Sequence, residues 1–106
     1  MNEISARELK HRMDAGEKFR LIDVREVPEY EYAKIEGAEL IPLSEFQSRY
    51  QKELNPDDDI VIYCHHGMRS AQACMFLHSQ GYKNLTNLRG GIEDWSSDVD
   101  ESVPHY

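Results

Sequence analysis

The sequence predicts an α/β protein with a parallel sheet that helices cover on both faces. Four short stretches have the length and residue types of strands, and stretches of helical character alternate with them along the chain. Glycine or proline marks most boundaries between the two kinds of stretch. This alternation is typical of a parallel sheet, because a helix supplies the crossover between parallel neighbours.

The first half of the chain is expected to begin with a helix and then to alternate strands and helices. Ser5 and Glu8 have the spacing of a capping box, and Leu9 and Met13 give an apolar stripe that ends before Gly16. The elements expected next are, in order, a strand over residues 19–24, a short helix from Pro28, a strand over residues 38–41 and a helix from Ser44 to about Leu54.

The second half contains the stretch around which the chain is organised. An apolar run over residues 60–63, between three aspartates and Gly67, predicts a buried strand. Ser70 is expected to cap a helix that ends at Gly81, and a strand over residues 84–88 and a short helix over residues 92–95 follow it. Residues 1–106 are therefore expected to form one domain, with residues 96–106 as an acidic C-terminal tail.

Cys64 lies where the strand over residues 60–63 turns into the following helix. Backbone N–H groups and the positive end of the helix dipole converge on such a loop and favour an anion there. A thiolate is an anion, so we expect the loop to lower the pKa of Cys64 and to make its sulfur nucleophilic. The second cysteine, Cys74, lies about one helical turn or more from the helix start, and we interpret it as a small core residue.

The loop and three other segments resemble the rhodanese sulfurtransferases, in which a cysteine accepts a sulfur atom and holds it as a persulfide. The four motifs follow the family's order over nearly the whole chain: Leu21-Ile22-Asp23-Val24-Arg25-Glu26, Ile35-Glu36-Gly37-Ala38 with Ile41-Pro42, Cys64-x-x-Gly67-x-Arg69-Ser70, and Gly90-Gly91-Ile92-x-x-Trp95. One departure is Lys34, where many members have a histidine.

The resemblance implies a rhodanese-like three-layer fold with a five-stranded, mostly parallel sheet flanked by helices. It also implies that Cys64 is the catalytic nucleophile, that no cofactor is needed, and that sulfur passes through a Cys64 persulfide from thiosulfate or a persulfide to cyanide, a thiol or a protein. The residues expected to bind substrate are those of the loop: His65, His66, Gly67, Met68, Arg69 and Ser70. Asp23 and Arg25 are expected to support the loop as an ion pair at a strand end.

Three loop residues have alternative interpretations. Arg69 either binds an anionic donor through its forked N–H groups or ties the loop to a carboxylate such as Asp23 or Glu26. The neighbouring His65 and His66 are residue types that bind zinc. Adjacent residues in a tight loop are expected to point apart, however, and no second ligand pair stands at a zinc-like interval, so we predict no metal site.

Composition limits the expected partners and location. The chain has 12 Lys and Arg against 20 Asp and Glu, and its net charge of −8 argues against nucleic acid and anionic membranes as partners. No apolar run approaches the roughly 20 residues of a membrane helix, and the first residues lack the features of a signal peptide. We therefore expect a cytoplasmic monomer that works with small sulfur donors and acceptors or with a protein persulfide partner.

Two other functions fit parts of the pattern. A cysteine phosphatase or an arsenate reductase also uses a cysteine loop that ends in arginine, but four residues separate Cys64 from Arg69 where those enzymes have five. The shorter loop favours a single sulfur atom over a phosphoryl group, whose oxygens must each meet N–H donors. The other alternative is a partner-dependent sulfur-relay or interaction module, and the presence of Cys64 argues against a purely non-catalytic one.

Overall fold

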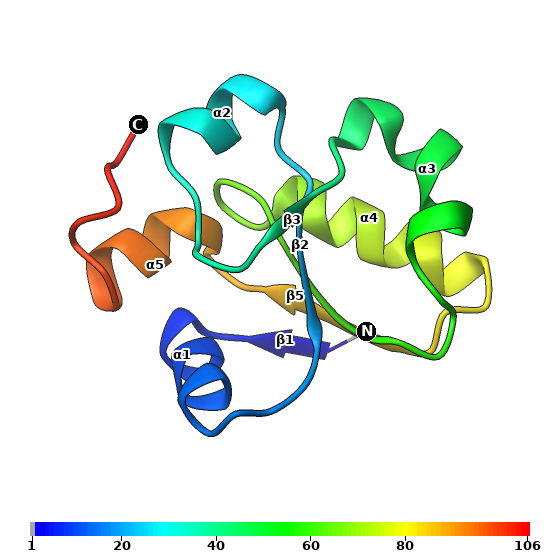
Figure 1. Ribbon diagram of the computed structural model, residues 1–106, viewed down its shortest axis with the longest axis horizontal. Coiled ribbons are helices and arrows are strands. Elements are labelled where there is room, and N and C mark those ends of the chain that lie inside the picture. The colour runs from blue at the N-terminus through cyan, green and yellow to red at the C-terminus, as the bar shows by residue number, and fades with distance from the viewer. Residues whose placement is uncertain (1) are drawn as a thin grey trace.

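The strands form one five-stranded sheet, and throughout residues 2–106, which the computed structural model describes, they pair in parallel (Figure 1). Across the sheet the order is β1-β5-β4-β2-β3. The strands are β1 (Asn2–Ile4), β2 (Arg20–Asp23), β3 (Glu39–Leu40), β4 (Asp59–Tyr63) and β5 (Asn84–Leu88). The predicted α/β class and five-stranded sheet are thus confirmed, and the sheet is wholly rather than mostly parallel.

The edge strand β1 is the element that the sequence did not reveal. It pairs with β5 from Asn2 opposite Thr86 to Ile4 opposite Leu88. Only one of its three residues is apolar, so β1 has neither the alternation nor the apolar run that marks a strand. Hydrogen bonds to the main chain of β5 hold these residues in an extended conformation, and their side chains contribute little to it.

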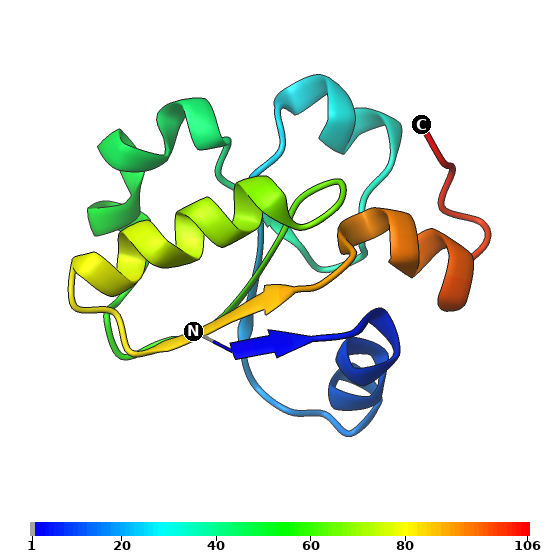
Figure 2. The same ribbon diagram turned by 180° about the vertical axis from the view of Figure 1, so that it is seen from behind.

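Helices cover both faces of the sheet (Figure 1, Figure 2). Helices α1 (Ala6–Asp14) and α5 (Gly91–Asp98) pack on one face, α3 (Phe46–Glu53) and α4 (Met68–Ser79) pack on the other, and α2 (Val27–Tyr32) follows β2. Strand β4 contributes to both cores, because Ile60 and Ile62 face α3 and α4 whereas Val61 and Tyr63 face α1 and α5. Within the described residues 2–106, every helix is too short or too polar to cross a lipid bilayer.

The start of α1 agrees with its capping signal, whereas the predicted start of α4 is wrong. The Ser5 hydroxyl accepts the N–H of Glu8 at 3.1 Å, and the Glu8 carboxylate accepts the N–H of Ser5 at 2.9 Å. Helix α4 begins at Met68 after Gly67, so Ser70 lies inside the first turn and is not its cap. Gly67 has φ +109°, a left-handed conformation that lets the chain turn into the helix three residues earlier than a cap at Ser70 would.

The last helix is longer than predicted, and the tail packs back on the domain. Helix α5 extends to Asp98 instead of ending near Trp95, and Ser96, which was assigned to the tail, is buried within it. Val103 then joins the core beneath α1 and α5. The C-terminal end at Tyr106 consequently lies beside α2, near the carboxyl edge of the sheet (Figure 1, Figure 2).

Candidate active site

Cys64 lies directly after the carboxyl end of β4, the central strand, between β2 and β5. Open parallel sheets place their sites at this edge. The loop from Cys64 turns at Gly67, where an added Cβ would lie 3.4 Å from the Gly90 nitrogen and 3.5 Å from the Leu88 carbonyl oxygen. These are ordinary contact distances, so the positive φ of +109°, which L side chains rarely adopt, explains the glycine.

Hydrogen-bond donors surround the sulfur of Cys64, which is only 1% exposed. The Gly67 N–H donates to Sγ at 3.1 Å, and the Ser70 Oγ lies 3.4 Å from Sγ. Burial raises the pKa of the thiol, but the Ser70 hydroxyl and the backbone N–H groups of Ser70, Gly67 and His66 together lower it by more. The pKa of Cys64 is therefore below its ordinary value, the direction expected for a thiolate in this loop.

Asn87, on β5, is a site residue that the sequence did not reveal. Its Oδ1 accepts the hydroxyl proton of Ser70 at 2.5 Å, and its Nδ2 donates to the Gly67 carbonyl at 3.1 Å. Because a serine hydroxyl has one proton, the Asn87 oxygen competes with the Cys64 sulfur for it. Asn87 is a buried amide, but β5 contains two other polar residues, Asn84 and Thr86, so the sequence did not single it out.

Arg69 forms a two-pronged ion pair with Glu29 of α2, so the suggested partners Asp23 and Glu26 are wrong. Its Nη1 and Nη2 donate to the two carboxylate oxygens of Glu29 at 2.7 and 2.9 Å. Arg69 lowers the pKa of Glu29 to about 2. Arg69 thus ties the loop to a carboxylate. The pKa of Arg69 is raised mainly by its hydrogen bonds to Glu29, and the charge of Cys64 adds a smaller effect in the same direction.

The expected ion pair between Asp23 and Arg25 is present and fully buried. Arg25 donates from Nε and Nη2 to the Asp23 carboxylate at distances of 2.7 to 3.1 Å. The same guanidinium donates to the carbonyls of Ala33 and Glu29. The pair therefore fastens α2 and the turn after it, and it supports the Cys64 loop indirectly, through the Glu29 that holds Arg69.

Tyr106 also reaches this site, although the tail offered only its acidic composition as a signal. Its hydroxyl accepts a hydrogen bond from Arg25 Nη1 at 2.9 Å and donates one to Glu29 Oε2 at 2.8 Å. Its ring stacks on His65, with 3.9 Å between centroids and 11° between planes. The tail thus forms part of the wall beside the loop.

The first turn of α5 forms hydrogen bonds with the backbone of the Cys64 loop. The Ile92 N–H donates to the Cys64 carbonyl at 3.0 Å, and the Glu93 N–H donates to the His65 carbonyl at 3.1 Å. A Cβ on Gly91 would lie 2.5 and 2.4 Å from these two carbonyl oxygens. Gly91 is required because the loop backbone occupies the space of a side chain.

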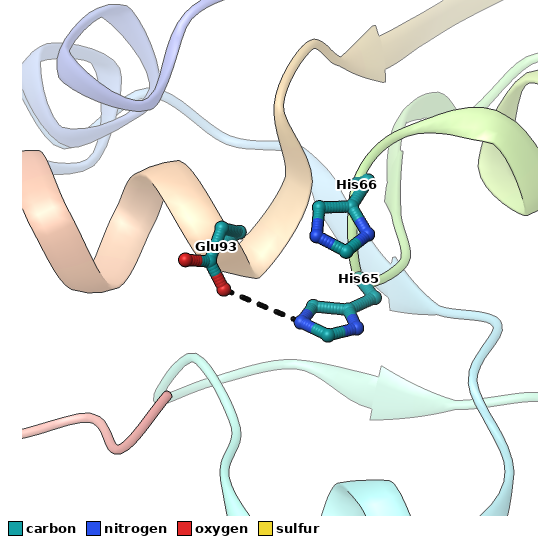
Figure 3. Close-up of side chains that lie close together, drawn as sticks. All are labelled: His65, His66 and Glu93. Atoms are coloured by element: carbon teal, nitrogen blue, oxygen red, sulfur yellow. Dashed lines mark hydrogen bonds and ion pairs between the residues drawn. The ribbon is translucent and has the colours of Figure 1, made fainter. Parts of the chain in front are cut away.

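His65 and His66 lie side by side at the rim of the site (Figure 3). Their ring centroids are 3.9 Å apart, and His65 Nε2 is 3.3 Å from Glu93 Oε1 on α5. The expectation that the two side chains point apart is wrong, because the tight turn toward Gly67 departs from the alternation of an extended strand. Within residues 2–106, His65, His66 and Glu93 are the group with ligand atoms close enough to hold a metal ion.

Cys74 lies within α4 and not in the Cys64 loop. It is fully buried in α4, and burial raises its pKa to about 12. Both cysteines are free. A buried thiol with a raised pKa is a poor nucleophile, so Cys74 has the properties of a core residue.

The structure thus defines an α/β domain with a buried cysteine, held by backbone N–H groups, at the carboxyl edge of a parallel sheet. Comparison with known families matches the Rhodanese-like domain to residues 5–98, and the chain belongs to this family.

Three similar proteins illustrate the relationship. The chain is 43% identical over 94 residues to the putative sulfur carrier protein YrkF of Bacillus subtilis, covering 89% of this chain and 50% of YrkF. It is 40% identical over 96 residues to a sulfurtransferase of Allochromatium vinosum, covering 91% of this chain and 89% of that protein. The structure of the human single-domain sulfurtransferase TSTD1 aligns with a TM-score of 0.83 and 30% identity, over 92% of this chain and 97% of the other. The chain thus spans half the length of YrkF and most of the length of the other two.

Proposed function

We propose that this chain is a sulfurtransferase that moves sulfane sulfur through a persulfide on Cys64. The observation that carries the proposal is the Cys64 sulfur, which lies 3.1 Å from the Gly67 N–H in a loop that lowers its pKa. A thiolate is the nucleophile that sulfur transfer requires. Membership of the rhodanese-like family and relatives named sulfur carrier and sulfurtransferase support the same reaction.

The reaction is a double displacement. The Cys64 thiolate attacks the outer sulfur of a donor such as thiosulfate, a new S–S bond forms, and sulfite leaves with the electron pair of the broken S–S bond. The terminal sulfur of the persulfide carries the negative charge, which the loop N–H groups stabilise. A nucleophile such as cyanide or a thiolate then attacks that sulfur and leaves as thiocyanate or as a new persulfide. The electron pair of the broken bond returns to Cys64, so the cycle balances without a cofactor.

The loop residues 65–70 supply the binding surface in this proposal. The N–H groups of His66, Gly67 and Ser70 face the sulfur, and Met68 is 79% exposed beside the opening. Arg69 adds positive charge, but a small anion has to compete with Glu29 for the guanidinium. The binding site therefore favours a persulfide that approaches Cys64 directly over a donor that depends on Arg69.

We propose that the cellular donors and acceptors are protein or low-molecular-weight persulfides and thiols. The net charge of −8 slows the approach of small anions, and a protein partner brings its own contacts to the rim. The name of YrkF, a putative sulfur carrier, is consistent with such a relay. A reactive thiolate needs a reducing compartment, so we place the chain in the cytoplasm as a monomer.

Serine substitutions at the two cysteines test the proposal. Thiosulfate with cyanide as acceptor measures the rate, and mass spectrometry measures the gain of one sulfur atom on the protein. We expect Cys64→Ser to abolish both the rate and the gain of sulfur, and Cys74→Ser to retain them. Retained activity in folded Cys64→Ser would refute the assignment. Sulfur loading of Cys64 from a protein persulfide, with no turnover of thiosulfate, would identify the chain as a relay module.

A further inference from the structure

His65, His66 and Glu93 present three ligand atoms within 4.8 Å of one another at the rim of the Cys64 loop (Figure 3). In a tetrahedral site with bonds of about 2.0–2.2 Å, neighbouring ligand atoms are about 3.3 Å apart. His65 Nε2 and Glu93 Oε1 already have this separation, at 3.3 Å. Two of the three ligands are therefore in position before any ion binds.

The surrounding side chains hold these two ligands in place. The His65 ring is stacked between the rings of His66 and Tyr106, with centroid distances of 3.9 Å to each. The second carboxylate oxygen of Glu93 lies 3.0 Å from His105 Nδ1, which orients the carboxylate. Partners of this kind, which fix a ligand without contacting the ion, commonly raise metal affinity.

His66 is the ligand that has to move. Imidazole nitrogen lone pairs lie in the plane of the ring, and the two ring planes are only 26° apart, so in the stacked arrangement the lone pairs lie in nearly parallel planes and do not meet at one ion. The His66 side chain is exposed, so a rotation that turns its nitrogen toward the ion costs only its stacking on His65, whose ring still packs on Tyr106. Two imidazoles and a carboxylate suit Zn²⁺ and its neighbours Co²⁺ and Ni²⁺, whereas Mg²⁺ and Ca²⁺ prefer oxygen ligands.

We propose that His65, His66 and Glu93 bind one divalent transition-metal ion of the zinc class, with water in the fourth position, and that the bound ion inhibits sulfur transfer. The ion would join the Cys64 loop to α5, since His65 and His66 belong to the loop and Glu93 to the helix. The His66 N–H is one of the donors to the Cys64 sulfur. Fixing His66 from outside therefore restricts a loop that must accommodate an extra sulfur atom and an incoming acceptor.

Calorimetric titration with Zn²⁺ tests the site in Cys64→Ser protein, where no reactive thiolate competes for the ion. We expect one ion per chain, and at least tenfold weaker binding when His66→Ala or Glu93→Ala is added. Matched controls are His78→Ala and Glu36→Ala, which remove an exposed histidine and an exposed glutamate elsewhere and should leave the affinity unchanged. Circular dichroism checks the fold of each variant.

The absence of saturable one-to-one binding, or equal affinities in His66→Ala, Glu93→Ala and their parent, would overturn the proposed site. In protein that retains Cys64, Zn²⁺ should inhibit sulfur transfer, and Glu93→Ala should need at least tenfold more Zn²⁺ for the same inhibition. Full activity of zinc-loaded protein would overturn the inhibitory role. Because affinity is measured without the nucleophile, the result for the site is independent of the proposed sulfur transfer.

Discussion

At the scale of single residues, the ionisation of Cys64 depends on how the hydroxyl proton of Ser70 is shared. The sulfur is buried, which opposes ionisation, and only a few polar groups offset that cost. Ser70 contributes both a hydroxyl and a backbone N–H, but Asn87 holds the hydroxyl proton while the sulfur is a neutral thiol. When the thiol ionises, the thiolate is the stronger acceptor, so we expect the hydroxyl to turn toward it.

Removal of the Ser70 hydroxyl is therefore expected to raise the pKa of Cys64. We predict that Ser70→Ala slows alkylation of Cys64 at neutral pH by about three- to tenfold, which corresponds to about 0.7–1.4 kcal/mol and lies within the net range for one hydrogen bond. The pH dependence of the iodoacetamide reaction measures the change. Ser79→Ala, at the far end of α4, is the matched control and should react as the wild type does. A midpoint in Ser70→Ala equal to or below that of the wild type would contradict this account.

At the scale of elements, three neighbours hold the loop between β4 and α4. Helix α5 binds its carbonyl groups, β5 binds the Gly67 carbonyl through Asn87, and α2 binds Arg69 through Glu29. Each contact joins segments that are distant in the sequence. The loop geometry that lowers the pKa of Cys64 is thus a property of packing between elements as much as of the loop residues.

The close approach of α5 to the loop makes Gly91 sensitive to substitution. We predict that Gly91→Ala destabilises the protein by more than the about 1–2 kcal/mol that a left-handed alanine costs, because its Cβ also overlaps two carbonyl oxygens. Gly16→Ala is the matched control, since Gly16 also has a positive φ but has open space around it. Urea unfolding measures both variants. Equal losses of stability would show that the contact between α5 and the loop is unimportant.

The ion pair between Glu29 and Arg69 should make the link between α2 and α4 sensitive to acid. The pKa of Glu29 is lowered from 4.5 to about 2, so the ionised carboxylate stabilises the fold above about pH 4.5, and this stabilisation is lost as the pH falls toward 2. We predict that Glu29→Gln lowers the free energy of unfolding by about 1 kcal/mol at neutral pH, because solvent partly screens the pair.

The difference in stability between wild type and Glu29→Gln should shrink as the pH is lowered from about 4.5 to 2. Urea unfolding at several pH values follows it, with Glu31→Gln, an exposed neighbour on the same helix, as the control. A difference that stays constant over this range would refute the assigned role of the Glu29 charge.

At the scale of the whole molecule, the net charge of −8 opposes the encounter with anionic donors. Because Glu29 partly neutralises Arg69, we predict that the long-range repulsion prevails over local attraction. Raising the ionic strength from about 0.01 to 0.15 M shortens the Debye length from about 30 to 8 Å, and kcat/KM for thiosulfate should rise severalfold. The kcat at saturating thiosulfate is the control and should change less. A fall of kcat/KM with salt would show that positive charge near Cys64 dominates.

Much of the architecture could be predicted from the sequence, because local patterns record local energies. The apolar run of β4, the capping box at Ser5 and the glycine-containing loop after Cys64 each stabilise their own segment, so each leaves a signal in neighbouring residues. The α/β class, the parallel sheet and the position of Cys64 at the carboxyl end of the central strand followed from these signals. The start of α4 was misplaced, because Ser70 resembles a cap while its hydroxyl serves Cys64 and Asn87.

The sequence by itself thus determined the strand that ends just before Cys64 and the loop that lowers the pKa of its thiol. Only the tertiary structure decided which distant groups complete the site. Strand β1 forms because β5 offers unpaired backbone groups, Glu29 holds Arg69 because the buried Asp23–Arg25 pair fastens α2 beside the loop, and Tyr106 reaches His65 because α5 and Val103 direct the tail back. Each of these contacts depends on the relative positions of packed elements, and no periodicity or spacing along the chain records such positions.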